Sequence, residues 1–469
     1  MAVERADDEA KLTPEVRNAL LALIVGGIAA ILDSTMVTLA LHTLVVGLHS
    51  TDGTIQWVTT GYLLAMAVAI PVTGWAESRW GGKRVWMAAL VLFVTGSVLC
   101  ALSWSAASLI GFRVLQGFAA GLIFPLMQTL GVKAAGGRAS SSLIATVSLP
   151  LALGPILGPV IGGVILNWLS WRWLFLVNVP VIAVGLVLAW RLLPPDRPAP
   201  GAAQAPLDVT GLVLLAPALA GILLGLSNLS EDGGIGHATV LVPLLAGIAL
   251  LGAFIAWAAR PGNRHPVVDV RLLRRRSLGT ASAVLFTAGA ATYAGMFLLP
   301  LYYQQLHGQT VLHAALLLIP QGVGSLAARS TVGKLVARLG ARLVTIASFL
   351  VAAAATVPFA FAGPHASLWL LGAALLVRGF GIGTVLVPPM SVAYQGIRPA
   401  GIPHATMNTR ISQQAGTSFG IAIAAVTLQS LLAHGATTAF QYAFWSAIGI
   451  TVAALIPALA LPSRKAVRD

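Results

Sequence analysis

The chain alternates between long apolar runs and short polar segments from one end to the other. Each run has about 20 residues or more, the length that an α-helix needs to cross the hydrocarbon core of a bilayer. The pattern therefore predicts an all-α polytopic membrane protein with about fourteen transmembrane helices. Their expected ranges are 18–45, 54–76, 85–104, 106–132, 141–167, 171–193, 208–228, 238–258, 278–304, 309–334, 341–362, 366–394, 403–431 and 436–461.

Composition excludes the main soluble classes. Of the 469 residues, 57% are apolar and 9% are charged, whereas a soluble domain carries about 25% charged residues. Cys100 is the single cysteine, so the sequence predicts neither a disulfide framework nor a thiolate metal site. The nine histidines lack metal-ligand spacing. We therefore expect no metal and no cofactor.

The net charge of +14 does not indicate nucleic-acid binding, because Lys and Arg occur in short clusters between apolar runs. Every second connection is basic, which is the mark of membrane orientation. The basic connections carry Arg79, Lys83, Arg84; Lys133, Arg138; Arg191, Arg197; the 260–276 cluster; Arg338, Arg342; and Arg398. This asymmetry predicts that both termini, 1–17 and 462–469, are cytoplasmic tails.

Two segments repeat at an offset near 260 residues. The stretch 74–84 resembles 333–342, and 113–117 resembles 378–383. We therefore expect two six-helix halves, 18–193 and 278–461. The segment between them, 194–277, would hold two inserted transmembrane helices and a basic cytoplasmic loop. Parallel halves of this kind place a substrate site between them near the bilayer midplane.

Five signatures, in order and correctly spaced, carry a family resemblance. They lie at 32–40, 74–84, 109–117, 154–163 and 171–180. On these residues the chain resembles the major facilitator superfamily, specifically its fourteen-span drug:proton antiporters. Two positions depart from the family pattern: Ser78 replaces the usual loop Asp, and His42 replaces a Pro.

The loop signature contains Gly74, Glu77, Arg79, Gly81 and Arg84. Gly81 and Gly340 permit a tight reversal of the chain, and the Arg residues can meet helix C-termini or acidic partners. Since Ser78 is not an anion, the charge latch that the resemblance implies would have to use Glu77. The alternative is that the basic residues only hold topology.

In the fifth apolar run, glycines spaced four residues apart share one helix face, which permits close contact with a second helix. The prolines beside them should bend the helix. The resemblance implies that this segment controls antiport; ordinary close packing is the alternative. The residues are Gly154, Pro155, Gly158, Pro159, Gly162 and Gly163.

Asp33 is the one acid deep inside an apolar run. A buried carboxylate must pair, lose its charge or face a cavity, and a proton-coupled transporter needs such a group. From their positions in their runs, Asp33 and Arg113 both lie roughly 10–18 Å below the outer surface. We therefore expect them to meet and to couple proton movement; a permanent structural ion pair is the alternative.

Candidate substrate-binding residues cluster in the second half. They are Tyr293, Phe297, Gln304, Arg378, Asn408, Arg410 and Gln413. Aromatic and amide side chains in a central cavity would suit a lipophilic, partly polar or cationic solute. For Tyr302 and Tyr303 an interfacial aromatic belt is an equally good interpretation.

These features predict a secondary antiporter that exports amphipathic small molecules in exchange for protons. The alternative is a narrow-specificity exporter of a metabolite, amino acid, siderophore or lipid on the same scaffold. The sequence lacks the phosphate-binding loop that an ATP-driven pump would need. It also lacks the cluster of acids or histidines that a membrane-embedded enzyme would need. We expect a monomer in a bacterial inner membrane, in contact with lipid and its small-molecule solute and not with nucleic acid.

Overall fold

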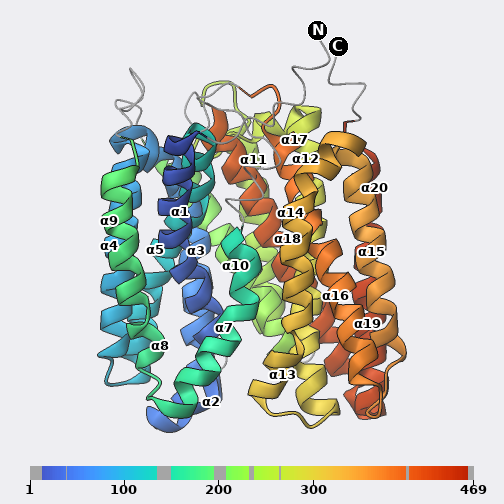
Figure 1. Ribbon diagram of the computed structural model, residues 1–469. Coiled ribbons are helices and arrows are strands. Elements are labelled where there is room, and N and C mark those ends of the chain that lie inside the picture. The colour runs from blue at the N-terminus through green and yellow to red at the C-terminus, as the bar shows by residue number, and fades with distance from the viewer. Residues whose placement is uncertain are drawn as a thin grey trace.

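The computed structural model describes residues 13–37, 40–134, 149–194, 207–231, 237–263, 266–397 and 401–462. Regular structure in these ranges is helical throughout. The first half contains α1 (Pro14–Met36), α2 (Leu41–Gly47), α3 (Asp52–Trp80), α4 (Gly82–Ala101), α5 (Ala106–Ala134), α7 (Leu149–Trp168), α8 (Trp173–Leu176) and α9 (Asn178–Leu192). In Figure 1 these helices form the blue and green bundle on the left.

The second half repeats this arrangement in yellow to red on the right of Figure 1. It contains α12 (Arg276–Leu301), η5 (Tyr302–Leu306), α13 (Val311–Leu317), α14 (Ile319–Leu339), α15 (Ala341–Phe361), α16 (Leu368–Val385), α17 (Val387–Ala393), α18 (Ile402–Leu431), η7 (Leu432–His434), α19 (Ala436–Ala453) and α20 (Leu455–Leu459). The main packing pairs correspond between halves: α1 with α7 and α12 with α18, α3 with α5 and α14 with α16, α4 with α5 and α15 with α16.

Two further helices, α10 (Val209–Glu231) and α11 (Ala238–Ala258), lie between the halves in sequence and pack on each other. α10 also contacts α3 of the first half and α18 of the second. A short 3-10 helix, η4 (Val270–Arg274), leads from this pair into α12. The inserted pair is therefore joined to both halves through α10.

The repeated loop has the same backbone conformation in both halves. Gly81 separates α3 from α4 with φ of 83°, and Gly340 separates α14 from α15 with φ of 83°. This φ lies in the region that residues with a Cβ rarely adopt. The expected glycine reversal is therefore present at both positions.

Every expected transmembrane run that lies in the described ranges is helical. Eleven helices of this part of the chain are long and apolar enough to cross a membrane, and the runs at 208–228 and 309–334 and the described part of 141–167 overlap α10, α14 and α7. Several runs are broken where a single helix was expected. Within the run 18–45 the first helix ends at Met36, and within the run 366–394 Leu386 separates two helices.

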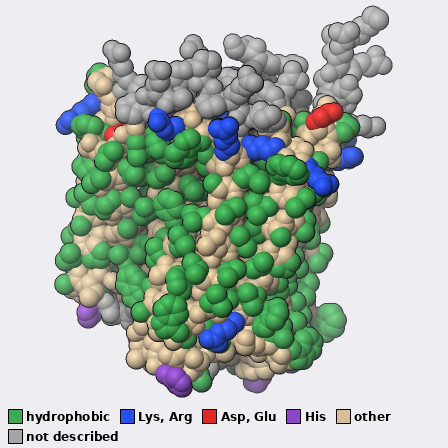
Figure 2. All heavy atoms as spheres, turned by 90° about the vertical axis from the view of Figure 1, so that its left-hand side faces the viewer, with side chains coloured by type: hydrophobic (Ala, Val, Ile, Leu, Met, Phe, Trp, Pro, Cys, Tyr) green, Lys and Arg blue, Asp and Glu red, His purple; other side chains and the backbone are tan. Residues whose placement is uncertain are grey.

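The surface matches a bilayer environment. Hydrophobic side chains cover the side of the molecule in Figure 2, and most Lys and Arg side chains visible there lie towards one end. Most of the tryptophans near the helix ends are exposed, with Trp104 76%, Trp168 75% and Trp369 90% accessible, as is typical of side chains at a membrane interface. Trp171 is the exception, because it is buried beside Gly47 and Phe175.

Candidate functional site

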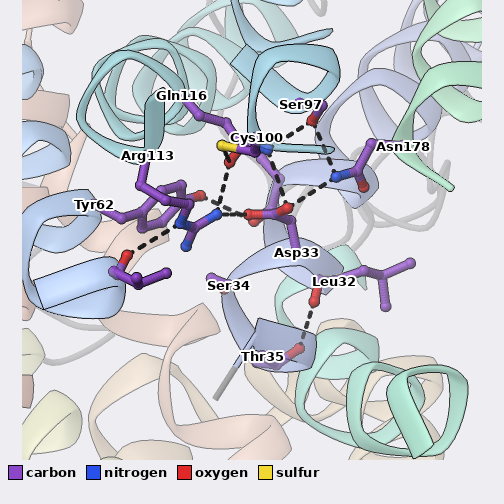
Figure 3. Close-up of polar contacts among 12 residues, drawn as sticks. Leu32, Asp33, Ser34, Thr35, Tyr62, Ser97, Cys100, Arg113, Gln116 and Asn178 are labelled. Atoms are coloured by element: carbon purple, nitrogen blue, oxygen red, sulfur yellow. Dashed lines mark hydrogen bonds and ion pairs between the residues drawn. The ribbon is translucent and has the colours of Figure 1, made fainter. Parts of the chain in front are cut away.

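A fully buried ion pair lies in the first half, where α1 approaches α5. The Arg113 Nη1 atom is 2.5 Å from the Asp33 Oδ2 atom, and neither side chain is accessible to solvent. Figure 3 shows the two side chains pointing directly at each other. The residues that the sequence placed at one depth are therefore in contact.

Two amides complete the surroundings of the carboxylate. Gln116 on α5 donates from Nε2 to Asp33 Oδ1 at 3.0 Å, and Asn178 at the start of α9 donates from Nδ2 to the same oxygen at 2.8 Å. Both amides also donate to the Ser97 hydroxyl of α4, at 2.6 and 3.2 Å. Four helices, α1, α4, α5 and α9, therefore converge on one carboxylate (Figure 3).

Arg113 is held by more than its acid partner. Its Nε donates to the Val58 carbonyl at 3.1 Å and its Nη1 to Gln116 Oε1 at 2.7 Å. The guanidinium carbon lies 4.0 Å from the ring centroid of Tyr62, whose hydroxyl donates to the Ala30 carbonyl at 3.2 Å. The face of the Tyr62 ring therefore stabilises the guanidinium cation, whose Nη2 atom has no hydrogen-bond partner among the described residues.

The donor pattern around Asp33 defines what the cluster can do. Three N–H groups point at two carboxylate oxygens, and an ionised carboxyl group is an acceptor only. A protonated Asp33 would carry an O–H that faces these N–H donors, so at least one contact would have to break. Proton binding at Asp33 and the contacts that join α1 to α5 and α9 are therefore mutually competitive.

Sequence reasoning singled out Asp33 and Arg113 and missed the polar partners around them. Gln116 and Asn178 lie inside two of the signatures, and Gln116 follows Arg113 by one helical turn. An amide in an apolar run was thus an available signal.

The glycine face of α7 packs on the segment of α1 that carries Asp33. A Cβ at Gly154 would overlap the Ile31 Cγ2 atom, and a Cβ at Gly158 would lie 2.8 Å from the Thr35 Cβ atom. The Thr35 hydroxyl donates across this contact to the Gly154 carbonyl at 3.1 Å. The helix that the glycines were expected to approach is therefore α1.

The C-terminal end of the same helix faces the second half. A Cβ at Gly163 would lie 3.3 Å from the Leu312 side chain of α13, and Gly162 beside it is buried. α7 is one continuous helix through both Pro155 and Pro159. A single helix thus links the Asp33 segment to the contact between halves.

The loop signature at 74–84 contains a buried acid. Glu77, expected at a loop or span end, lies in α3 with 2% exposure, and its Oε1 atom is 2.6 Å from the Lys133 Nζ atom of α5. The neighbouring Lys83 donates to the carbonyls of Trp190 and Leu193 at the end of α9, at 2.8 and 2.5 Å. Glu77 therefore forms an interhelical ion pair beside Ser78.

The remaining loop residues have separate surroundings. Gly74 is buried in α3, whereas Arg79 and Arg84 are exposed. The Arg79 guanidinium lies 6.0 Å from the centroid of the Trp75 ring. Glu77, Lys83 and Lys133 therefore join helices at this end of the molecule.

The candidate substrate residues do not form one group. Arg378 lies inside the second half, where its Nε donates to Thr356 at 3.2 Å and its Nη1 to Gln321 at 2.7 Å. Arg410 on α18 donates to Gln413 at 3.2 Å, and α18 packs along α12, which carries Tyr293. α18 contacts α3, α5 and α10, so this second group lies nearer the interface between halves.

Three candidates lie elsewhere. The Asn408 amide donates to the carbonyls of Asp269 and His404, at 3.1 and 2.9 Å, and so anchors the linker before η4. Phe297 and Gln304 are half-buried on α12 and η5. Tyr302 and Tyr303 are buried at 0% and 1% exposure, so the interpretation as an interfacial belt is wrong for them; Tyr302 packs against three phenylalanines of this half.

Comparisons with known proteins agree with this architecture. The Major Facilitator Superfamily model matches residues 23–409. The chain is 34% identical over 415 residues to the "Multidrug resistance protein B homolog" of Mycobacterium tuberculosis (strain ATCC 25618 / H37Rv), covering 88% of this chain and 76% of that protein. It is 29% identical over 432 residues to the "Putative multidrug resistance protein MdtD" of Serratia proteamaculans (strain 568), covering 91% and 88%.

Two solved structures share the fold at low sequence identity. The crystal structure of the human organic anion transporter MFSD10 (TETRAN) superimposes with a TM-score of 0.64 at 16% identity, covering 95% of this chain and 99% of that one. The proton:xylose symporter XylE, bound to 6-bromo-6-deoxy-D-glucose, gives a TM-score of 0.65 at 14% identity, covering 95% of each chain.

Proposed function

Because the chain belongs to the Major Facilitator Superfamily, we propose that this multi-pass membrane transporter exports amphipathic or lipophilic small molecules in exchange for protons. The curated relatives named as multidrug resistance proteins support the class of solute. The observation that carries the proposal is the Asp33 cluster, since it contains a fully buried carboxylate whose contacts compete with a proton.

The cluster supplies a physical link between protonation and helix packing. With Asp33 ionised, α1 is tied to α5 through Arg113 and to α9 through Asn178. Protonation of Asp33 removes the negative charge that Arg113 balances. It also adds an O–H donor next to the N–H donors of Arg113 and Asn178, so both interhelical contacts weaken together. Alternating access requires such a change in how the helices of one half pack.

α7 is the element that we propose passes this change to the other half. It touches α1 on both sides of Asp33, at Ile31 and Thr35, and touches α13 through Gly163 and Leu312. Near the opposite end the halves meet where Gln128 donates to the Met390 sulfur at 3.3 Å. Breaking contacts at one end while those at the other persist would open the central region to one side.

The solute would bind between the halves, in the region of Tyr293, Arg410 and Gln413. A tyrosine and an amide offer a π-face and hydrogen-bonding groups to a partly polar aromatic solute. We further propose that both termini are cytoplasmic, because the basic connections all fall on that side. Export then uses the proton gradient across a bacterial inner membrane.

The test is transport by the purified protein in liposomes, with ethidium and tetraphenylphosphonium as lipophilic cations and chloramphenicol as a neutral drug. With a proton gradient imposed, we expect the wild type to accumulate at least one of them against its gradient. Asp33→Asn should abolish gradient-driven accumulation while retaining exchange of labelled for unlabelled solute at equal pH. Asparagine keeps the side chain's shape but cannot ionise.

Glu15→Gln is the matched control, because Glu15 is an exposed acid on the same helix. It should transport like the wild type. Gradient-driven accumulation by Asp33→Asn at the wild-type rate would refute the assignment of Asp33 as the coupling acid. Failure of the wild type to respond to any proton gradient would refute antiport itself.

A further inference from the structure

The second half contains a counterpart of the Asp33 cluster in which the acid is missing. A shift of 259 residues carries Gly81 to Gly340, and the same shift carries Asp33 to Thr292 and Ser97 to Thr356. Arg378 on α16 corresponds to Arg113 on α5 by its place in the repeated segment. The corresponding positions therefore hold a guanidinium and two hydroxyls but no carboxylate.

These corresponding residues surround a small cavity. Arg378, Thr292 and Thr356 line it together with Thr451 and apolar side chains such as Phe349 and Ile382. Its size is that of a water molecule or a single halide ion, too small for a drug-sized solute. The cavity thus lies where the repeat would place the Asp33 carboxylate.

The charge on Arg378 is unbalanced within the described residues. The side chain is 3% exposed, and the ion pairs of this part of the chain are Asp33 with Arg113 and Glu77 with Lys133. Its polar contacts are the neutral Thr356 hydroxyl and Gln321 amide oxygen. Burying an unpaired cation is strongly unfavourable, and a neighbouring anion offsets that cost.

Thr292 supplies the independent sign of a ligand. Its side chain is 7% exposed, its hydroxyl lacks a hydrogen-bond partner among the described residues, and it borders the cavity. By contrast, the hydroxyls of Thr356 and Thr451 each donate to a carbonyl of their own helix at 2.7 Å. The unpartnered O–H of Thr292 and the guanidinium of Arg378 are two donors that suit one small anion.

We propose that this cavity binds one small monovalent inorganic anion of halide size, such as chloride, between Arg378 and Thr292. The anion occupies the place that the Asp33 carboxylate fills in the first half, and it neutralises the second half without a titrating group. This site is separate from solute binding and does not depend on proton coupling. The two halves then balance their buried arginines by different means.

The test measures binding of radiolabelled chloride to the purified full-length protein in detergent, with gluconate maintaining ionic strength. We expect saturable binding of about one chloride per molecule, competed by bromide and not by sulfate or phosphate, which are too large for the cavity. Replacing gluconate by saturating chloride should also raise the melting temperature by about 2–4 °C, because the ligand stabilises the state that binds it.

Four variants separate this site from general charge effects. Arg378→Gln should lose chloride binding, and Thr292→Asp should lose it as well, because a built-in carboxylate then pairs with Arg378 as Asp33 pairs with Arg113. Thr292→Val, which preserves shape and removes the hydroxyl, should weaken binding about tenfold. Arg410→Gln removes a different buried arginine that does not line the cavity, and it should keep both binding and the chloride-dependent rise in melting temperature.

Absence of saturable chloride binding to the wild type would overturn the proposal. So would wild-type binding by folded Thr292→Asp or Thr292→Val, or equal competition by sulfate, since each would place the anion elsewhere. The readout is binding, so its failure leaves the antiport proposal intact, and failure of antiport leaves this site intact.

Discussion

Close packing of α7 on α1 at Gly154 can be tested with a single methyl group. In Gly154→Ala, the new Cβ overlaps the Ile31 Cγ2 atom, and Ile31 is 5% exposed and β-branched, so it has little freedom to turn away. Overpacking of this kind costs about 1–3 kcal/mol, and the gain in helix propensity from Gly to Ala returns about 1 kcal/mol. We therefore expect a net loss of roughly 2 kcal/mol at most, together with slower proton-driven export.

The compensating change is Ile31→Ala, which removes Cγ2 and leaves the Ile31 Cβ position 3.3 Å from the new methyl group. That separation is tight but needs only a few tenths of an ångström of adjustment. In a double-mutant cycle on thermal or denaturant stability, the pair should therefore show a favourable coupling of about 1–3 kcal/mol, and the double variant should export faster than Gly154→Ala alone.

Gly111→Ala provides the control, because a Cβ at Gly111 on α5 has no heavy atom within 4 Å. It should be neutral or slightly stabilising, and it should not couple to Ile31→Ala. Additivity of Gly154→Ala and Ile31→Ala within about 0.5 kcal/mol would refute the packing argument. Wild-type export by Gly154→Ala would show that this contact has no role in the transport cycle.

Other perturbations have equally definite outcomes. Arg113→Lys keeps the charge but cannot reproduce the fork that contacts Asp33, Val58 and Gln116, so we expect at least a tenfold loss in liposome export at normal expression. Glu77→Lys should impair export, and the reversed pair Glu77→Lys with Lys133→Glu should restore part of it; no recovery would remove the ion pair from the mechanism. Burial and the neighbouring His365 lower the pKa of His307 from its ordinary 6.5, so the stability it contributes is present above pH 6.5 and lost as pH falls through the lowered value. His307→Gln should flatten the melting-temperature profile between pH 7 and pH 5, and an unchanged profile would contradict this assignment.

The sequence predicted the elements of this fold because the bilayer imposes a length and a composition on each helix. It also paired Asp33 with Arg113, because depth along two helices follows from residue counts alone. Both inferences depend only on the position of a residue along its helix axis. They need no knowledge of which face of a helix points inward.

The errors concern the direction in which a side chain points. Lipid and protein interior are both apolar, so the sequence does not distinguish a lipid-facing side from a buried one. Tyr302, expected as an alternative at the membrane interface, is buried among phenylalanines. Asn408, proposed for a central cavity, donates to the linker carbonyl of Asp269, a contact that the sequence did not predict. Gln116 and Asn178 were visible as polar residues, but their meeting at Asp33 depends on how four helices are rotated.

Proton release on solute binding is the most direct test of Asp33 as the coupling group. Tetraphenylphosphonium would be added to purified protein in weakly buffered detergent solution, and a pH-sensitive dye would report protons released per solute bound. Across a titration from pH 5 to pH 9, we predict that the wild type has a pH range in which binding releases about one proton, and that Asp33→Asn binds the cation without this release. Equal release by the wild type and by Asp33→Asn would contradict the assignment, because the proton would then come from another group.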